Sequence, residues 1–303
     1  MKLRWWATPL LAGLIAFGGP TSAKSTTADS QPEGTEVALT FLEMVVGDQN
    51  AVQNGLSWIK ANWEPGMVPM ALETIRLVRD PTARIALLNV LQSNTGQTFS
   101  TDIRAWQVWL WNQDIKPVPG YALFKSHLYG LIDPAFKGYF DEKREITIDL
   151  DEVVWGGVRQ DGIPPLRSPS MVAAKEAEYL ADDHIVFGIS INGDARAYPK
   201  RILAWHEMFV DTVGGTPVAG VYCTLCGTVI LYHTTLNGTN HALGTSGFLY
   251  RSNKLMYDQA TQSLWSTMRG TPVIGPLVGK EVRLARGSVV TTTWGAWRAR
   301  HPN

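Results

Sequence analysis

The sequence PVAGVYCTLCGTVILYH, residues 217–233, places the only two cysteines of the chain, Cys223 and Cys226, between two runs rich in Val, Ile and Tyr. These residue types are enriched in β-strands, and both runs alternate as strands do. The stretch therefore predicts two strands joined by a tight turn that carries a Cys-x-x-Cys-Gly motif. We expect Gly227 to supply the positive φ that lets both sulfurs point toward a common centre.

Strand and turn signals recur on both sides of this hairpin. Asn192-Gly193 is the strongest two-residue hairpin signal of the chain, and it separates expected strands at 185–191 and 195–198. Further strands are expected at 146–150, 209–213, 241–245, 254–257, 282–284 and 289–293, with short helices at 171–180 and after Pro199. This spacing predicts a mainly antiparallel, β-rich domain over residues 141–303, either a sandwich or a partial barrel with few, short helices.

Residues 35–114 have a different periodicity. Apolar residues follow a 3.6-residue stripe at 67–79 and 82–92, and Asp80-Pro81 between them is a helix-start signal. The pattern predicts short antiparallel helices similar to HEAT-type pairs, followed by a connection at 115–140. The fold class is therefore expected to be α+β, with a helical repeat-like region before the β-rich domain.

The first residues have the pattern of a targeting segment. Lys2 and Arg4 precede a short apolar run, and Thr21-Ser22-Ala23 offers a small-residue cleavage site. We expect a signal peptide at 1–23 and a polar linker at 24–34. The mature protein is then exported, to the periplasm or the extracellular space, with no membrane span after cleavage.

The charge balance limits the classes of partner. The chain has 27 basic and 27 acidic residues, a net charge of +0, so no electrostatic argument favours nucleic acid. We expect no nucleic-acid partner and no nucleotide cofactor. A protein partner on the helical region is the remaining expectation.

The leading hypothesis for the cysteines is a transition-metal site. Thiolates from Cys223 and Cys226, with a nitrogen from His206, are a ligand set that suits Zn, Cu or Fe. His233, His241 and His301 are less well placed in the sequence as ligands. The opposing interpretation of His206 is a structural histidine bonded to a carbonyl.

Two alternatives stay open. In an exported protein the pair could be a thiol-disulfide oxidoreductase site, in which Cys223 attacks and Cys226 resolves. It could also be a local disulfide in a non-enzymatic binding module. Glu207, Arg196 and Asp258 are the candidate catalytic residues, with a buried polar network that includes Arg196, Tyr198 and Asp258 as the structural alternative.

Several separated motifs in the second half resemble one family. They are Asp161-Gly162-Ile163-Pro164-Pro165, Arg196-Ala197-Tyr198-Pro199, Trp205-His206-Glu207, Tyr222-Cys223-Thr224-Leu225-Cys226-Gly227-Thr228, Ser246-Gly247-Phe248-Leu249-Tyr250, the segment 256–265 and Trp294-Gly295-Ala296-Trp297. In this order they resemble the bacterial and archaeal family known as domain of unknown function 3179, over roughly 149–303. The resemblance implies a fold unit and a motif set, and no reaction. Thr224 departs from the Pro usual in the family, and relatives usually continue past Asn303, so we expect that a closing strand is missing or that the chain is a fragment.

Overall fold

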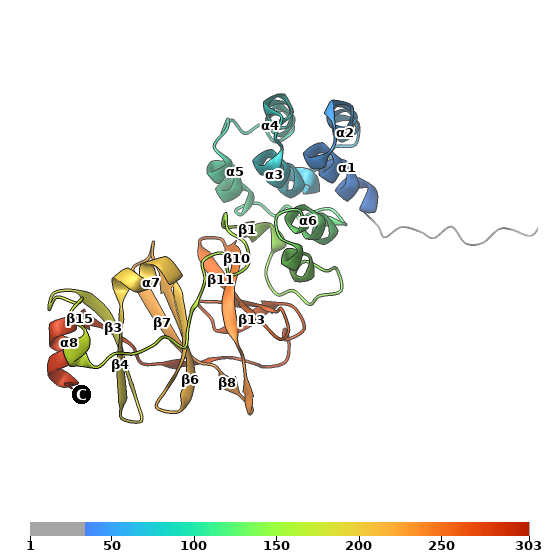
Figure 1. Ribbon diagram of the computed structural model, residues 1–303. Coiled ribbons are helices and arrows are strands. Elements are labelled where there is room, and N and C mark those ends of the chain that lie inside the picture. The colour runs from blue at the N-terminus through green and yellow to red at the C-terminus, as the bar shows by residue number, and fades with distance from the viewer. Residues whose placement is uncertain (1–33, 303) are drawn as a thin grey trace, which may run out of the picture. The chain divides into compact units, whose positions relative to one another are not determined.

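The computed structural model describes residues 34–302, which contain a helical part followed by a β-rich part (Figure 1). The expected signal peptide and nearly all of the expected linker lie outside the described residues. None of the described helices has both the length and the apolar character needed to cross a membrane.

The helical part contains six α-helices. They are α1 (Thr35–Val46), α2 (Gln49–Ala61), α3 (Val68–Leu77), α4 (Pro81–Thr95), α5 (Ile103–Leu110) and α6 (Tyr121–Gly130), with 3-10 turns η1 (Pro65–Met67) and η2 (Pro134–Tyr139). Asp48, Asp80 and Asp102 cap α2, α4 and α5, each accepting a hydrogen bond from a backbone N–H of the first turn. The helical prediction is confirmed, and its HEAT-type repeat stays a prediction.

Residues 115–140, which were expected to be a connection, contain α6 and η2. The reason is a lysine in the apolar face of α6. Lys125 lies among the buried residues Tyr121, Phe124 and Leu128, and its own side chain is fully buried. A charge at that position hides the apolar periodicity from which a helix is predicted.

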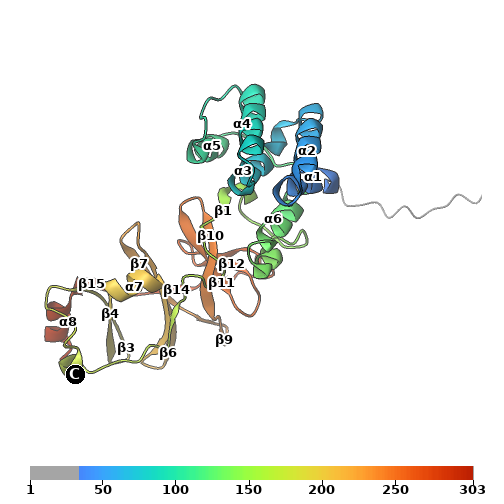
Figure 2. The ribbon, with the colours of Figure 1, turned by 45° about the horizontal axis from the view of Figure 1, so that its top comes forward.

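The β-rich part is built from three main sheets, shown from a second direction in Figure 2. The first sheet has the order β1 (Val153–Trp155), β10 (Leu243–Tyr250), β11 (Asn253–Asp258), β12 (Leu264–Ser266) and β13 (Thr271–Ile274). The second has the order β14 (Ala285–Gly287), β7 (Thr228–His233), β6 (Thr216–Cys223), β5 (Met208–Val213) and β2 (Leu166–Arg167). The third has the order β15 (Val290–Thr293), β3 (Ile185–Ile191) and β4 (Asp194–Pro199).

The remaining elements are small. Strands β8 (Thr235–Leu236) and β9 (Thr239–Asn240) form a two-stranded ribbon, and helices α7 (Lys200–His206) and α8 (Trp294–Arg300) are short, as are the 3-10 turns η3 (Leu150–Glu152) and η4 (Ala174–Glu176). All pairings of the sheets are antiparallel except β2 with β5. None of the sheets formed by the described residues closes into a barrel, so the α+β prediction is confirmed with open sheets.

The second sheet lies between the first and the third, and its strand β6 is buried on both faces. Val218 and Tyr222 on one face join a core with the third sheet, whereas Ala219 and Val221 on the other face join a core with the first sheet. A strand buried on both faces is apolar at nearly every position, as PVAGVY is. At Gly220 a Cβ atom would lie 2.0 Å from the ring of Phe209, so only glycine fits there.

The helical part packs against the first sheet. Phe248 of β10 lies within ring contact of Tyr129, Phe136, Tyr139 and Phe140, with centroid separations of 4.8 to 6.1 Å. The helices and one face of this sheet therefore share a single core.

Some expected elements differ from the structure. Residues 171–180 are not an α-helix, because only Ala174–Glu176 form a 3-10 turn; the segment instead buries Ala177 and Leu180 under Trp294 and Trp297. Residues 146–150 make one isolated bridge, from Ile146 to Ile274, and no strand. No strand covers 282–284, and β14 follows it. Strands β12 and β13 were not expected, because each is short and β13 contains Pro272.

Asp151 of η3 gives the fold a specific pH dependence. Burial raises the pKa of its carboxyl to about 6, and the positive charge of Lys125 opposes the shift. The unfolded carboxyl has a pKa of roughly 3.9. Because the folded state binds this proton more tightly, the contribution to stability is present below about pH 4 and is lost as the pH rises to about 6. We therefore expect Asp151→Asn to be more stable than the parent chain at pH 7 and equally stable at pH 4.

Urea unfolding of the two proteins at pH 4, 5, 6 and 7 measures this difference. Asp114→Asn is a control, since this carboxylate is almost fully exposed. A gap between Asp151→Asn and the parent chain that does not change with pH would contradict the prediction.

Candidate functional site

The cysteine motif forms the turn between β6 and β7, as predicted. Cys223 is the last residue of β6 and pairs with Thr228, the first residue of β7. Gly227 has φ +67°, and its N–H donates to the carbonyl of Cys223 at 2.9 Å. The positive φ expected of Gly227 is therefore present.

The two cysteines are joined as a disulfide at the surface. Their Cα atoms are 5.3 Å apart, and the backbone N–H of Cys226 donates to Sγ of Cys223 at 3.2 Å. Cys226 is exposed and Cys223 is half-buried, while Leu225 between them is 94% exposed. The pair is accessible to another molecule from the side of Cys226.

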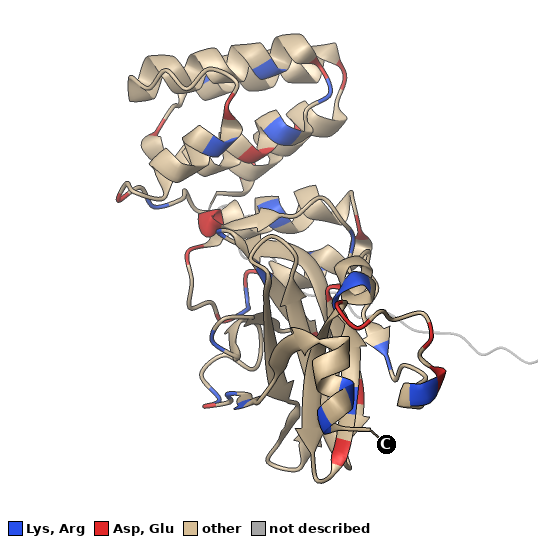
Figure 3. Cartoon of the chain, turned by 90° about the vertical axis from the view of Figure 1, so that its left-hand side faces the viewer, with Lys and Arg blue, Asp and Glu red and all other residues tan. Residues whose placement is uncertain are grey.

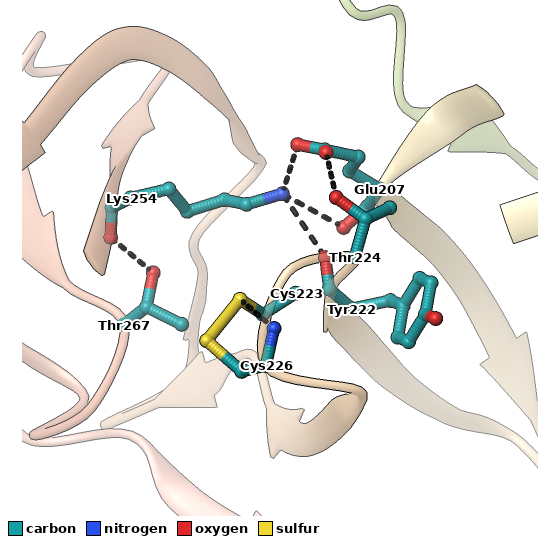
Figure 4. Close-up of a disulfide and its surroundings, with 7 residues drawn as sticks. All are labelled: Glu207, Tyr222, Cys223, Thr224, Cys226, Lys254 and Thr267. Atoms are coloured by element: carbon teal, nitrogen blue, oxygen red, sulfur yellow. Dashed lines mark hydrogen bonds and ion pairs between the residues drawn. A yellow bond between two sulfur atoms is a disulfide. The ribbon is translucent and has the colours of Figure 1, made fainter. Parts of the chain in front are cut away.

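A half-buried ion pair lies beside the disulfide (Figure 4). Nζ of Lys254 is 2.7 Å from Oε2 of Glu207, and it also donates to the carbonyls of Tyr222 at 3.1 Å and of Glu207 at 3.2 Å. The other carboxylate oxygen of Glu207 accepts from the hydroxyl of Thr224 at 2.9 Å. Cys223 therefore lies between two residues, Tyr222 and Thr224, that the ion pair fixes.

The backbone of Glu207 makes this arrangement possible. Glu207 follows α7 with φ +55° and ψ −4°, the left-handed conformation that commonly ends a helix. Its carbonyl accepts from the N–H of Tyr222 at 2.9 Å. The left-handed backbone conformation is unfavourable for residues other than glycine, so the surrounding contacts must hold Glu207 in it.

Lys254 connects the first and second sheets. It belongs to β11 of the first sheet; its acceptor Tyr222 belongs to β6 of the second sheet, and Glu207 lies between α7 and β5. Burial lowers the pKa of its ammonium group, and the carboxylate of Glu207 opposes that shift.

Removing this ammonium group should loosen the turn. Lys254→Met keeps the apolar stem but leaves Glu207, whose side chain is 20% exposed, without its cation. An unpaired, largely buried polar group costs about 1–3 kcal/mol, so we expect a loss of that size in the free energy of unfolding, measured by urea titration. Lys280→Met, at an exposed lysine, is the control. Equal effects of the two substitutions would refute the structural role of Lys254.

The three expected metal ligands do not form a metal site in this structure. The two sulfurs are bonded to each other, and Nδ1 of His206 donates to the carbonyl of Pro164 at 2.8 Å. Within residues 34–302, no group of three or more His, Cys, Asp or Glu side chains is arranged to hold a metal ion. His206 thus has the role that was its alternative, a histidine bonded to a carbonyl, and it fixes the segment at 161–165 to α7.

Arg196 belongs to a polar network away from the disulfide. Its guanidinium contacts both carboxylate oxygens of Asp194 at 2.8–3.1 Å and Asp211 at 2.7 Å. The hydroxyl of Tyr198 donates to the same oxygen of Asp211 at 2.7 Å. The expected network of Arg196 and Tyr198 is present, and Asp211 joins them in place of Asp258.

Asp258 forms a separate buried pair. Its carboxylate lies 2.7 Å from Nδ1 of His241, whose ring is 5.4 Å from that of Trp265. The second carboxylate oxygen accepts the N–H of Ala260 at 2.9 Å, the turn geometry typical of Asp at this position. Of the candidate catalytic residues, only Glu207 therefore lies beside the cysteines. His233 is the last residue of β7, and the ring of His301 lies 4.2 Å from that of Trp297 at a tilt of 37°.

The second half of the chain matches one family model. Residues 160–303 match the family described as protein of unknown function (DUF3179). This part of the chain belongs to that family. No curated protein and no solved structure matches the chain. The family model confirms the resemblance that the motifs indicated.

Hydrogen bonds connect several motifs of the DUF3179 domain that are far apart in the sequence. Oδ1 of Asp161 accepts the N–H of Thr245 at 2.9 Å, and Oδ2 accepts the hydroxyl of Tyr257 at 2.6 Å. These bonds tie the first motif to β10 and β11. Burial and this carboxylate together raise the pKa of Tyr257 to about 12, so its hydroxyl stays a donor at neutral pH.

Sequence reasoning missed Lys254 and Asp211. The signal for Lys254 is its place in β11, where Lys254, Met256 and Asp258 share one face by alternation. Met256 and Asp258 are both buried, and so are Leu255 and Tyr257 on the other face, so a lysine in this strand points toward the interior on either face. Such a lysine indicates an acidic partner, which here is Glu207.

Proposed function

We propose that the DUF3179 domain is a thiol-disulfide exchange protein whose reactive pair is Cys223 and Cys226. The observation that carries the proposal is that the disulfide lies in an exposed turn whose neighbouring residues are held in place by hydrogen bonds. Cys226 is exposed, its N–H points at Sγ of Cys223, and Lys254 and Glu207 fix the residues on either side of Cys223. An N–H aimed at a sulfur stabilises the thiolate that forms there when the disulfide opens.

The exchange has two balanced steps. A thiolate of a dithiol substrate attacks Sγ of Cys226, forming a mixed disulfide while Cys223 leaves as a thiolate. The second thiolate of the substrate then attacks the substrate sulfur of that mixed disulfide, which releases Cys226 as a thiolate and closes the substrate disulfide. Both electrons pass from the substrate dithiol to the cysteine pair, and the reverse reaction follows the same path.

The different exposure of the two cysteines decides which sulfur is attacked and which one leaves. Cys226 is the sulfur that the partner reaches, and Cys223 is the one whose negative charge the N–H of Cys226 stabilises. This order reverses the assignment expected from the sequence, in which Cys223 makes the first contact. Export into an oxidising compartment, which the first residues predict, suits such chemistry.

A purely structural disulfide is the weaker explanation. In the chain-entropy model, a bridge between residues three apart contributes about 2 kcal/mol, compared with about 4.7 kcal/mol for a 100-residue loop. The β6–β7 hairpin already has its own hydrogen bonds and its buried residues. The hairpin therefore gains less stability from this bridge than a long loop would gain from one.

Mixing the oxidised protein with a reduced, unfolded test protein that has one cysteine pair tests the proposal. Alkylation and mass spectrometry would count thiols in both proteins over time. We expect each disulfide lost at Cys223–Cys226 to appear in the test protein. The Cys223→Ser/Cys226→Ser variant is the control. A pair that stays oxidised beside the reduced test protein, or that excess dithiothreitol does not open without denaturant, would refute the proposal.

A further inference from the structure

Strand β4 presents unpaired backbone groups at the edge of the third sheet. It pairs with β3 on one side only, through a two-residue turn whose residues Asn192 and Gly193 both have positive φ. In such a hairpin the closing pair, Ile191 with Asp194, is hydrogen-bonded, and bonded pairs then alternate.

This alternation fixes the direction of each backbone group of β4. Arg196 and Tyr198 bond to β3, so the N–H and C=O of Ala195 and Ala197 point away from the sheet. None of these four groups bonds to another element among residues 34–302. Pro199 ends the row, since it has no N–H. The edge thus offers two donor–acceptor pairs, two residues apart.

A cavity of about 290 Å³ lies along this edge. All six residues of β4 line it, together with the segment at 169–180, the start of α7, and the rings of Trp294 and Trp297 from α8. Met171 and Val172 on its rim are 42% and 51% exposed. The walls are mostly apolar and aromatic, and polar groups come from the edge of β4 and from Ser170, Tyr179 and His301.

The charges at the cavity determine which side chains it accepts. Arg196, which lines the cavity, is paired with Asp194 and with Asp211, so this group of three has a formal net charge of −1, and by alternation it lies on the face of β4 opposite to Ala195 and Ala197. An acidic side chain meets no unpaired cation of this group, and beside Trp294 and Trp297 it would be buried against apolar rings, so neutral side chains are favoured on both faces. Figure 3 shows that acidic and basic residues are interspersed over the visible face, so no broad field of one sign adds to this local preference.

We propose that the edge of β4 and its cavity bind a short, extended peptide segment of another protein, which adds a strand next to β4. Only an extended backbone presents N–H and C=O groups at the two-residue spacing of Ala195 and Ala197. Its alternate side chains then enter the apolar cavity beside Trp294 and Trp297. The site lies on β4, apart from the disulfide turn, and the proposal does not depend on thiol exchange.

Two variants isolate the backbone groups. Ala197→Pro removes an N–H that points away from β3, so the β3–β4 bonds stay intact while the outer donor is lost. Thr291→Pro is the matched control. Thr291 of β15 pairs with Phe187 of β3, and the same alternation points the N–H of Thr291 away from β3, at the opposite edge of this sheet. The two substitutions make the same chemical change in one sheet.

The experiment selects binders for the full chain from a displayed library of random heptapeptides. We expect enriched peptides with alternating apolar residues and no acidic residue at the inward positions. Their dissociation constants should rise at least tenfold for Ala197→Pro and stay unchanged for Thr291→Pro. N-methylation of the tightest-binding peptide should abolish binding when it is placed at every second residue and leave binding unchanged at the residues between. This measurement uses the unsubstituted protein, so it remains valid even if a proline variant fails to fold.

Three outcomes of the peptide experiment would overturn the proposal. They are an absence of enriched peptides, equal binding to both proline variants, and tolerance of N-methylation at all positions. Self-association of the chain that Ala197→Pro abolishes, measured by sedimentation, would make a second copy the occupant and would also overturn it.

Discussion

Lys125→Met should destabilise the protein by about 3–5 kcal/mol, the cost of leaving one partner of a buried ion pair alone. Nζ of Lys125 is fully buried, 2.5 Å from Oε1 of Glu73 and 2.7 Å from the carbonyl of Val153. The hydroxyl of Tyr121 donates to the same oxygen of Glu73 at 2.6 Å. Without the lysine, the carboxylate of Glu73 stays in the core with one donor.

A second substitution separates this cause from lost packing. Glu73→Gln removes the charge, so the Glu73→Gln/Lys125→Met protein should recover most of the loss, since a buried ion pair is often no more stable than neutral residues of its size. Urea unfolding of the single and double variants measures the recovery. Lys116→Met, at a surface pair with Asp114, is the control and should change stability by less than about 1 kcal/mol. A double variant as unstable as Lys125→Met would show that packing, rather than charge, is responsible.

The same lysine joins the two parts of the molecule. Val153, which accepts from Lys125, is in β1 at the edge of the first sheet, and Arg76 of α3 donates to the carbonyl of Trp155 in the same strand at 3.0 Å. Loss of Lys125 should therefore lower the stability of both parts together. The helical part and the β-rich part are expected to unfold in one transition.

The fold was predictable wherever local signals agreed. Alternation located β3 and β5–β7 to within a residue or two, and Asn192-Gly193 fixed a hairpin, because these features depend on a few neighbouring residues. Residues 171–180 resembled a helix because Ala and Glu favour one. They form one wall of the cavity at β4 instead, because Ala177 and Leu180 pack under Trp294 and Trp297, which lie far away in sequence. Tertiary packing overrode local propensity there.

The candidate site was predictable in its cysteines and Glu207, and not in what surrounds them. The motif alone indicated a turn with both sulfurs together. Lys254 comes from another sheet, and the sequence separation gave no reason to pair it with Glu207. His206 was placed near the cysteines by order along the chain, yet its ring points to Pro164. Proximity in sequence does not determine which way a side chain points.

The two single cysteine variants should differ sharply in what they trap. With Cys223→Ser, the thiolate of the exposed Cys226 attacks the disulfide of an oxidised substrate protein, and one substrate sulfur leaves as a thiolate. Because Cys223 is absent and cannot then release the substrate from Cys226, the mixed disulfide should accumulate. With Cys226→Ser, the remaining sulfur is half-buried, so at least tenfold less adduct is expected.

Non-reducing electrophoresis after incubation with the single-pair test protein in its oxidised, disulfide form measures the adduct, and alkylation of the variant beforehand is the control for reactive thiols. Glu207→Gln in the Cys223→Ser background should reduce the adduct modestly, since Thr224 then loses a charged acceptor while Cys226 stays exposed. Equal amounts of adduct with both single variants would contradict the prediction that the substrate contacts Cys226 first. Greater trapping by Cys226→Ser would instead make Cys223 the first point of contact, and the N–H of Cys226 would then stabilise the attacking thiolate rather than the leaving one.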